Sequence, residues 1–438
     1  MTHADVDSRP RRGSGIYGSR AASDPRYGDS QYDDSQYGDA WFEDRRYGDD
    51  RRRRPAGRDD DDYDDDPPDL GTGRRGPRWA KLCLILGSLL MVVSGFVIVG
   101  GKAVTAYFTG GINQEDLLGN QRAEGANIDG PVNILLLGMD ERTNSQAMIR
   151  TDSIIIAHVT ANHDAVYLIS LPRDTRVEVP AFEPSGYRGG FQKLTEAFAV
   201  GNATSEGKGD PSLEGRQKGV QLMAQTINGL VPGGLKFNAV ALINYSGFQK
   251  LVYALGGVEM CIDQKVVSLH FDRNGKYVGD TIKKGIPGYT YEVGCRMLKP
   301  WEALDYVRQR ENLPHGDYDR QRHQQQFLFA MFKQLLSKGT LTDITKFGAL
   351  KDAAGELLTL DLGKTSIPDW IFSFKNVRSN DITMIKTNAG KFTSQTVDGK
   401  SFEVLSADSV KLLEALRDDK IYDFLLSHPD WVARPDAP

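Results

Sequence analysis

One uncharged segment divides this sequence into two unequal parts. Residues 82–101 are 20 residues without a charged side chain, and three arginines and a lysine closely precede them. About 20 such residues cross the hydrocarbon core of a bilayer as a helix, and positive charges stay on the cytoplasmic side. We therefore predict a transmembrane helix over residues 79–101, with the 337 residues from Lys102 onward outside the cell membrane. A cleaved signal peptide is the alternative, although its leader would be unusually long.

The first 78 residues differ in composition from the rest of the chain. They contain 15 Arg, 18 Asp, one Glu and no Lys, and an aromatic residue recurs at every fifth position from Tyr27 to Tyr47. A segment with so few aliphatic side chains cannot bury a hydrophobic core, so we expect a disordered cytoplasmic tail over residues 1–78. Such a tail either docks a partner or is simply solvated. We expect an extracellular linker over residues 102–126.

Residues 127–430 have the pattern of one folded extracellular domain. Uninterrupted apolar runs predict buried strands, and other segments predict helices. The expected strands are 132–138, 153–159, 165–170 and 258–261, the expected helices are 246–255, 300–307 and 319–338, and 201–216 is expected to be a flexible loop. This pattern predicts an α/β fold with a mixed central β-sheet covered by helices on both faces. The net charge beyond residue 101 is only −2, which argues against a nucleic-acid partner.

Two of the three cysteines fall in the segment predicted to be extracellular. Cys83 lies inside the apolar run, whereas Cys261 and Cys295 lie where oxidation is permitted. A disulfide between them would close a loop of about 34 residues, and two free thiols are the alternative. No spacing of cysteine and histidine resembles a zinc site.

The helix predicted from residue 319 carries two polar side chains on its apolar face. At 100° per residue, Gln324 falls within roughly 100° of Arg320, together with the apolar side chains that follow. A buried arginine requires an anion or several acceptors, so this face predicts an anion-binding site. The alternative is an internal ion pair with Asp317 or Asp319. Arg322 falls on the opposite side, where we expect it to be solvated.

Three further arginines could join Arg320. On one continuous helix, Arg308 and Arg310 would diverge by roughly 200°, so they can cooperate only if the helix ends just before them and the chain becomes extended. Arg173 follows a predicted strand, directly after Pro172, which ends the hydrogen-bond ladder. Arginine suits a phosphate site, because its planar guanidinium forms bidentate bonds and keeps its charge.

Two carboxylates lie at the ends of neighbouring predicted strands. Asp140 follows the first strand, and Asp152 stands at the start of the second. If these strands are adjacent, both carboxylates reach one rim of the sheet, where α/β proteins bind ligands. Together with phosphate oxygens, they could bind Mg²⁺. Alternatively, Asp140 caps a turn and Asp152 pairs with Arg150. Lys193, at the start of a predicted helix, could add a positive charge.

Six segments, in their order and spacing, resemble the LytR-CpsA-Psr family across residues 131–340. They are 133–140, 150–152, 170–175, 193–198, 244–258 and 298–325. The charged tail and the cysteine pair resemble members from high-GC Gram-positive bacteria. The resemblance implies a membrane-anchored phosphotransferase that moves a glycopolymer from a polyprenyl-pyrophosphate carrier to peptidoglycan, with Mg²⁺ as cofactor.

The resemblance also implies roles for individual residues. Asp140 and Asp152 would bind the metal, and Asp317 would orient an arginine. The residues that would hold the pyrophosphate are Arg173, Arg308, Arg310, Arg320 and Gln324, with Arg150 and Lys193 close by. The family often has arginine at the position of His323. The alternative functions are a polyprenyl-pyrophosphate pyrophosphatase and a lipid-pyrophosphate sensor without catalysis.

Overall fold

A computed structural model describes residues 113–123, 128–141, 147–337 and 358–433. The chain divides into two units, Met1–Gly73 and Arg74–Pro438, and every described residue belongs to the second unit. The predicted tail, the predicted transmembrane helix and part of the predicted linker lie outside the described residues. Within the described ranges, no helix is both long and apolar enough to cross a membrane.

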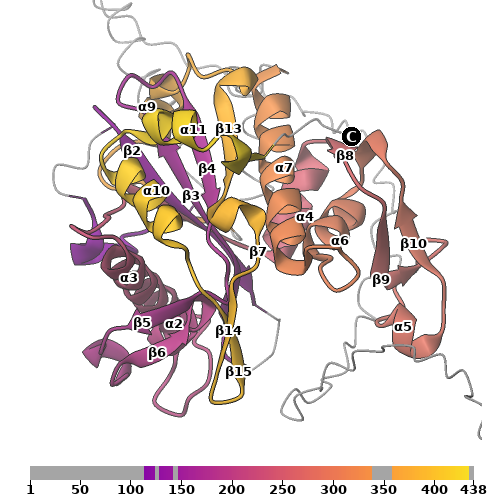
Figure 1. Cartoon of the computed structure of the whole chain (residues 1–438), viewed down its shortest axis with the longest axis horizontal. Coiled ribbons are helices and arrows are strands. Elements are labelled where there is room, and N and C mark those ends of the chain that lie inside the picture. The colour runs from indigo at the N-terminus through magenta and orange to yellow at the C-terminus, as the bar shows by residue number, and fades with distance from the viewer. Residues whose placement is uncertain (1–112, 124–127, 142–146, 338–357, 434–438) are drawn as a thin grey trace, which may run out of the picture. The chain divides into compact units, whose positions relative to one another are not determined.

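The second unit is built around an eight-stranded sheet (Figure 1). The strand order from edge to edge is β1-β12-β7-β2-β3-β4-β13-β16. The strands are β1 (Asn113–Gln114), β2 (Val132–Asp140), β3 (Arg150–Val159), β4 (Val166–Ser170), β7 (Ala239–Asn244), β12 (Leu358–Asp361), β13 (Ile382–Lys386) and β16 (Val432–Ala433). β2, β3 and β4 are antiparallel neighbours, whereas β7 is parallel to β2 and β13 is parallel to β4. The sheet is therefore mixed, as predicted.

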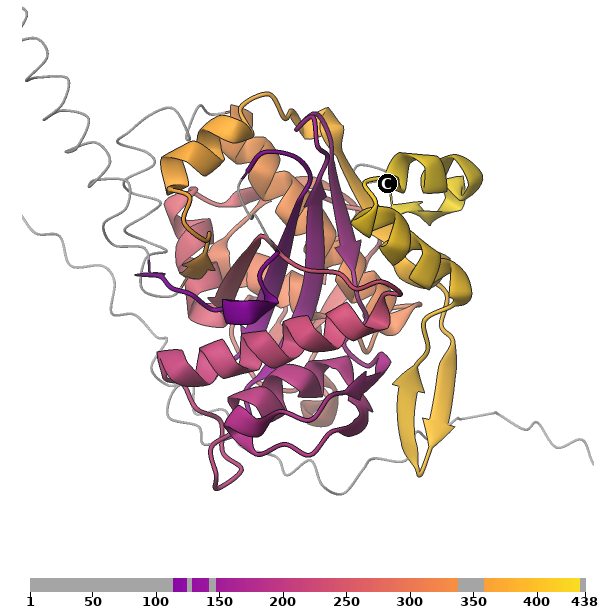
Figure 2. The same ribbon diagram turned by 90° about the vertical axis from the view of Figure 1, so that its left-hand side faces the viewer.

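Alternate side chains of the central strands pack on opposite faces of the sheet, because successive residues of a strand point to opposite sides. Leu135 and Ile156 join the hydrophobic core on one face, whereas Leu136 and Ile155 pack towards α7 (Gly316–Ser337) on the other. The helices of the first face are α2 (Leu194–Asn202), α3 (Leu213–Leu230), α10 (Ala407–Arg417) and α11 (Ile421–Ser427). Figure 2 shows α3 lying across the strands.

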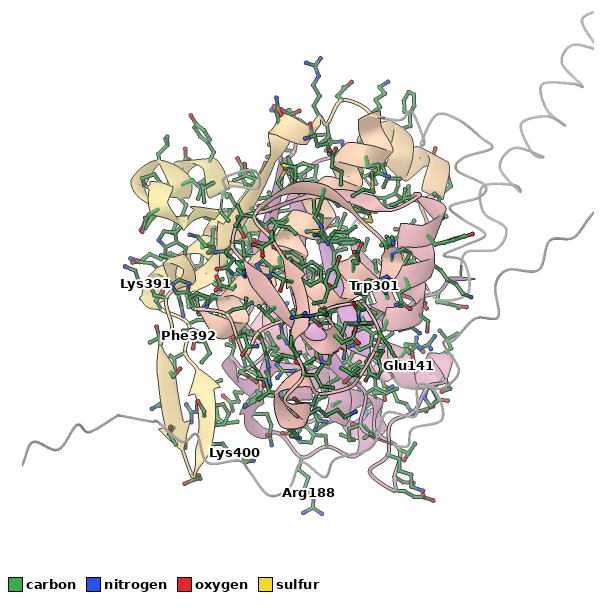
Figure 3. The ribbon with its side chains drawn as sticks, turned by 90° about the vertical axis from the view of Figure 1, so that its right-hand side faces the viewer. Glu141, Arg188, Trp301, Lys391, Phe392 and Lys400 are labelled. Carbon is green, nitrogen blue, oxygen red and sulfur yellow. A yellow bond between two sulfur atoms is a disulfide. The ribbon has the colours of Figure 1, made fainter. Side chains whose placement is uncertain are left out.

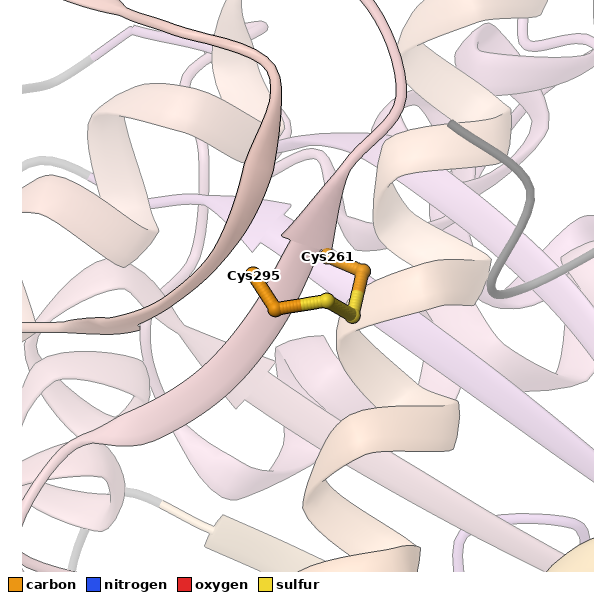
Figure 4. The surroundings of a disulfide bond; sticks show 2 residues. All are labelled: Cys261 and Cys295. Atoms are coloured by element: carbon orange, nitrogen blue, oxygen red, sulfur yellow. A yellow bond between two sulfur atoms is a disulfide. The ribbon is translucent and has the colours of Figure 1, made fainter.

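A second group of elements precedes α7 in the chain and packs beside it. These elements are α4 (Tyr245–Ala254), β8 (Val258–Ile262), β9 (Val266–Asp272), α5 (Thr281–Lys284), β10 (Gly288–Tyr291), β11 (Gly294–Leu298) and α6 (Pro300–Arg308). Their buried side chains form one hydrophobic cluster with Phe327 and Leu335 of α7. Cys261 and Cys295 face each other across β8 and β11 and form a disulfide (Figure 4). Of the two alternatives for these cysteines, the disulfide is the one present.

The predicted helices appear as α4, α6 and α7, but α3 is not among the helices that the sequence predicts. The remaining elements of the described ranges are β5 (Arg176–Val179), β6 (Gly190–Lys193), α9 (Ile367–Ser373), β14 (Ser394–Val397), β15 (Lys400–Glu403) and five short 3₁₀ helices. α3 begins inside the segment 201–216, which was expected to be a loop, and Ser212 caps it by accepting a hydrogen bond from Gly215 N. Its glycines weaken the helical signal. Close packing of α3 against Phe198 requires glycine at position 219, because a Cβ there would lie 2.9 Å from the Phe198 ring.

Candidate functional site

The candidate site begins at an irregularity between β2 and β3. Along these strands the pairing is regular, except that Gly138 pairs with Ser153 and Met139 pairs with Thr151. Asp152 is therefore the additional residue of a β-bulge, a distortion that redirects a side chain at the end of a sheet. The bulge removes Asp152 from the regular alternation of β3.

Asp152 lies at the centre of a polar cluster. Its Oδ1 accepts a hydrogen bond from Arg173 Nη1 at 2.6 Å, and its Oδ2 accepts one from the Tyr245 hydroxyl at 3.3 Å. Its backbone carbonyl accepts a hydrogen bond from Arg320 Nη2 at 3.2 Å. Three segments that are distant in the sequence thus meet at one residue.

Arg320 occupies the first turns of α7, with its side chain only 6% exposed. Its Nη2 lies 2.5 Å from Asp317 Oδ1, and Gln321 Nε2 donates to Asp317 Oδ2 at 2.9 Å. The internal ion pair considered above as an alternative is therefore present. However, the Nε groups of Arg320 and Arg173 are buried and have no hydrogen-bond partner among the described residues. A buried donor without a partner costs about 1–3 kcal/mol, so both groups favour an additional acceptor.

Arg308 and Arg310 lie near the cluster because α6 ends between them. α6 stops at Arg308, and Gln309 is extended, with φ −62° and ψ 135°. Burial lowers the pKa of Arg310, and the positive charges of Arg173 and Arg320 lower it further. The pKa of Arg310 therefore responds to the other two guanidinium groups. The condition predicted for cooperation between Arg308 and Arg310, a helix that ends at this point, is met.

The pKa of Asp152 reflects these surroundings. Burial alone would raise this pKa, but the guanidinium groups of Arg173, Arg320 and Arg308 lower it below its ordinary value. Burial lowers the pKa of Arg173, but the charges of Asp152 and Asp174 more than offset that effect and raise it. Asp152 is thus kept ionised by arginines from three different segments.

Lys193, Arg150 and Asp140 each lie at the end of a strand, β6, β3 and β2 respectively. Lys193 is the N-cap residue of α2, and its Nζ lies 3.1 Å from Asp174 Oδ1. Arg150 Nε lies 2.7 Å from Glu196 Oε1, whereas Asp152 Oδ1 lies 2.6 Å from Arg173 Nη1. Asp140 ends β2 directly opposite Arg150.

The two predicted metal ligands, Asp140 and Asp152, offer the carboxylate oxygens that Mg²⁺ prefers. Across the described ranges, however, no group of three or more His, Cys, Asp or Glu side chains is arranged to hold a metal ion. Both side-chain oxygens of Asp152 already accept hydrogen bonds, from Arg173 and from Tyr245. The donor set fits a divalent cation if phosphate oxygens complete the coordination and Asp152 exchanges one of these contacts.

Two other polar residues of α7 link this helix to its neighbours. Gln324 Nε2 donates to the backbone carbonyl of Val307 at 3.4 Å, which joins α7 to the end of α6. Arg322 is not simply solvated, as was predicted, because it pairs with Asp319 at 3.0 Å and with Asp263 at 2.9 Å. The helical periodicity correctly places Arg322 on a different side of α7 from Arg320. Asp263, the residue after β8, lies next to that side and pairs with Arg322.

His323, the next residue of α7, has a structural role here. Its side chain is fully buried and stacks on Tyr306, with ring centroids 4.3 Å apart. Burial, together with the charge of Arg322, lowers the pKa of His323 to about 3. The imidazole is therefore neutral at physiological pH and adds no positive charge to an anion site.

Tyr245 and Asp174 belong to the cluster but are not among the residues predicted from the sequence. Tyr245 donates to Asp152 and lies beside Arg308, whose guanidinium carbon is 4.3 Å from the ring centroid. Asp174 Oδ1 lies 3.9 Å from Arg173 Nε. A signal for Tyr245 exists, because it directly follows β7, which runs parallel to β2 and ends at the same edge of the sheet.

A model of the LytR_cpsA_psr family matches residues 103–418 of this chain. The cell wall biosynthesis protein LcpA of Corynebacterium glutamicum is 26% identical over 328 residues, which are 70% of this chain and 59% of LcpA. The polyisoprenyl-teichoic acid–peptidoglycan teichoic acid transferase TagU of Oceanobacillus iheyensis is 27% identical over 279 residues, which are 64% of this chain and 72% of TagU. The fold is similar to the crystal structure of a Streptococcus agalactiae protein, with a TM-score of 0.51, 21% identity, and coverage of 66% of this chain and 88% of that one. The match to LcpA thus spans less than two thirds of the length of that relative.

Proposed function

This chain belongs to the LytR-CpsA-Psr family, and from that premise we propose that it transfers a glycopolymer from a polyprenyl-pyrophosphate carrier to peptidoglycan. The product would be a phosphodiester link between the polymer and a sugar of the acceptor. The name of TagU describes such a transfer for teichoic acid, which supports the proposal at the level of the reaction class.

One observation carries the proposal, namely the convergence of arginines on the ionised Asp152. Arg173 and Arg320 both contact this residue, and Arg308 lowers its pKa from the end of α6. The Nε groups of Arg173 and Arg320 remain without hydrogen-bond partners among the described residues. A pyrophosphate presents two adjacent phosphates, whose oxygens suit the planar fork of guanidinium. The cluster is therefore suited to hold the diphosphate of the donor.

In the proposed reaction, the oxygen of an acceptor hydroxyl forms a bond to the phosphorus nearest the polymer. The bond from this phosphorus to the bridging oxygen breaks, and its electron pair leaves with polyprenyl phosphate. The hydroxyl proton passes to a base or to water. The arginine side chains hold the diphosphate and stabilise the charge that develops on the leaving phosphate. Because the arginines lower its pKa, Asp152 is a weaker base than an ordinary aspartate.

Asp140 and Asp152 are the residues that would hold Mg²⁺ together with phosphate oxygens. The ion would neutralise charge on those oxygens when it is bound. We expect that chelation with EDTA stops the transfer and that added Mg²⁺ restores it. Transfer at an unchanged rate in EDTA would contradict the role of the metal and leave the arginine site in place.

We place the reaction outside the cell membrane. In this proposal, residues 79–101 anchor the domain beside the bilayer, where the polyprenyl chain of the donor is embedded. The disulfide between Cys261 and Cys295 supports an oxidising compartment. The acceptor, peptidoglycan, lies on that same side.

Arg320→Ala is expected to lower the transfer rate at least about a hundredfold, because loss of one preorganised donor to a developing charge has an effect of that order. The measurement uses the full-length protein in detergent with a synthetic polyprenyl-pyrophosphate glycan, peptidoglycan and Mg²⁺. Arg188→Ala, at an exposed arginine, is the matched control and should keep the wild-type rate. A normal rate in Arg320→Ala, with the fold intact by circular dichroism, would contradict the proposal.

The same assay separates transfer from the alternatives. A pyrophosphatase would release polyprenyl phosphate equally well without an acceptor, whereas a sensor would bind the donor and release nothing. Asp152→Ala should lose transfer and still bind the donor, because the arginines remain. Full activity in Asp152→Ala would show that this carboxylate has no part in the reaction.

A further inference from the structure

A buried hydrogen-bond network joins two segments that each carry an arginine of the cluster. We call these segments the two arms: one is the turn with Arg173, and the other is the first turns of α7 with Arg320. Arg173 follows β4 and Arg320 lies in α7, so tertiary contacts set the distance between them. The neighbour of Arg173, Asp174, accepts a hydrogen bond at its backbone carbonyl from Glu403 N at 2.9 Å. Close to Arg320 in the same helix, the Tyr318 hydroxyl donates to Glu403 Oε1 at 2.8 Å. Glu403, the last residue of β15, therefore contacts the segment that carries Arg173 and the segment that carries Arg320.

Glu403 is held in an unusual environment for a carboxylate. Glu403 is only 5% exposed. Its Oε1 accepts hydrogen bonds from the Tyr318 hydroxyl, from Asn388 Nδ2 at 3.0 Å and from Thr393 N at 2.7 Å. Among the residues with a described position, no cationic side chain pairs with it. A buried carboxylate without a counter-charge depends on such donors. Burial and the bond to Glu403 raise the pKa of Tyr318, so its hydroxyl keeps its proton.

The backbone next to this network is strained, and several hydrogen bonds hold it in place. Asn388 and Ala389 have φ values of 54° and 52°, in the left-handed region that residues with a Cβ rarely adopt. Asn388 Oδ1 accepts hydrogen bonds from Ser406 N at 2.8 Å and from Ser409 Oγ at 2.7 Å, while its Nδ2 donates to Glu403. Such a conformation persists only where the surrounding contacts fix it, often near functional sites. The network therefore holds this part of the backbone in an otherwise unfavourable conformation.

The β14–β15 hairpin extends away from the domain, and its base lies at this network. Figure 3 shows Lys391 and Phe392 near the base of the hairpin and Lys400 farther along it. Phe392 lies edge-on to the Tyr318 ring, with centroids 4.9 Å apart, and beside Gly316 at the start of α7. The hydrogen bond from Glu403 N to the Asp174 carbonyl belongs to a β-bridge that pairs Thr175 with Glu403. The base of the hairpin is thus attached both to the Arg173 turn and to the first turn of α7.

We propose that Glu403 and Tyr318 are positioning residues that form a clasp and set the separation between Arg173 and Arg320. This inference rests on the proposed function, because it takes a diphosphate as the ligand. One arm can hold a single phosphate, but two linked phosphates require both arms at a fixed separation. The clasp therefore determines how strongly the site prefers a diphosphate over a monophosphate.

The test compares the binding of geranylgeranyl pyrophosphate and geranylgeranyl monophosphate to the full-length protein in detergent by isothermal titration calorimetry. Tyr318→Phe removes one hydroxyl and keeps the ring, and Glu403→Gln removes the charge and keeps the shape. In both variants, we expect the preference for the diphosphate to fall about tenfold, the order for loss of one hydrogen bond to a charged group, with little change for the monophosphate. Tyr422→Phe, at a tyrosine 65% exposed, is the matched control and should keep the wild-type preference.

The outcomes separate this inference from the proposed function. A wild-type protein without any preference for the diphosphate would overturn both. A wild-type preference that Tyr318→Phe and Glu403→Gln leave unchanged would overturn the clasp alone. Equal weakening of both ligands in both variants would also overturn it, because general loss of structure does not discriminate between one phosphate and two.

Discussion

At the residue scale, Asp152 illustrates how burial and charge are balanced in this site. Its side chain is 23% exposed, and its Oδ1 lies 2.6 Å from Arg173 Nη1. Removing one partner of such a pair leaves the other charge poorly compensated, which costs more than the pair itself contributes. Asp152 is thus a counter-ion for the arginines, and in the proposed function it becomes a metal ligand as well.

Asp152→Asn is expected to lower the free energy of unfolding at pH 7 by about 2 kcal/mol, less than for a fully buried pair because Asp152 is partly exposed. The arginines lower the pKa of Asp152 in the folded state. Its contribution is therefore complete above the unfolded pKa of about 3.9 and is lost as the pH falls through the lower folded value. Urea unfolding of both proteins should show a constant difference from about pH 8 to 5 that shrinks below about pH 4.

Asp423→Asn, at an exposed aspartate of α11, serves as the control and should stay within about 0.5 kcal/mol of the wild type. A difference between wild type and Asp152→Asn that grows as the pH falls would show that the sign assigned to the pKa shift is wrong.

At the element scale, the ends of helices decide which side chains reach the cluster. α6 ends at Arg308, so Arg310 leaves the helical periodicity and lies near Arg173 and Arg320. Gln324 in α7 donates to the last turn of α6 and keeps this end in place. The β8–β11 pair lies in the same group of elements, and its disulfide covalently closes the segment that leads from α4 to α6.

Reduction of the disulfide between Cys261 and Cys295 is expected to lower the free energy of unfolding by about 3–4 kcal/mol, because the closed loop no longer restricts the unfolded chain. Urea unfolding with and without dithiothreitol measures the change. The double variant with serine at both positions should show the lower stability in either condition. A wild-type midpoint that does not respond to the reductant, with reduction verified by thiol titration, would contradict this expectation.

At the scale of the whole molecule, the site depends on both the sheet and the elements beside α7. β2, β3 and β4 bring Asp152 and Arg173 to one end of the sheet, while α6 and α7 supply the other arginines. The sheet itself is stabilised by separate hydrophobic cores on its two faces. The cluster is therefore a product of the assembled domain, and the proposed anchor only places this domain at the membrane.

Deletion of residues 1–101 is expected to release the protein from the membrane without changing its affinity for geranylgeranyl pyrophosphate. The removed segment includes the only 20-residue uncharged run in the sequence, and every described residue of the cluster lies beyond it. Fractionation of cells that produce either chain, followed by carbonate extraction, measures membrane association. A deleted chain that still sediments as an integral membrane protein would contradict the anchor.

Much of the fold follows from local patterns in the sequence. The apolar runs of β2, β3 and β4 are continuous, so they predict strands of a covered sheet, and this prediction is confirmed. Glycines obscure α3, because their low helix propensity hides a helix that tertiary packing stabilises. The convergence of arginines is predicted in outline only through the resemblance to the family, which implies one pyrophosphate site for them.

What the sequence by itself determined is the set of local properties: the apolar run, the strands, the polar face of α7 with Arg320 and the need for a helix end at Arg308. These follow from periodicity and composition, which act over a few neighbouring residues. Only the tertiary structure decided the partners: Arg173 for Asp152, the acids that bind Arg322, and the clasp at Glu403. Ion pairs and buried hydrogen bonds depend on which segments, distant in the sequence, come together in the fold. A local sequence pattern does not specify which segments these are.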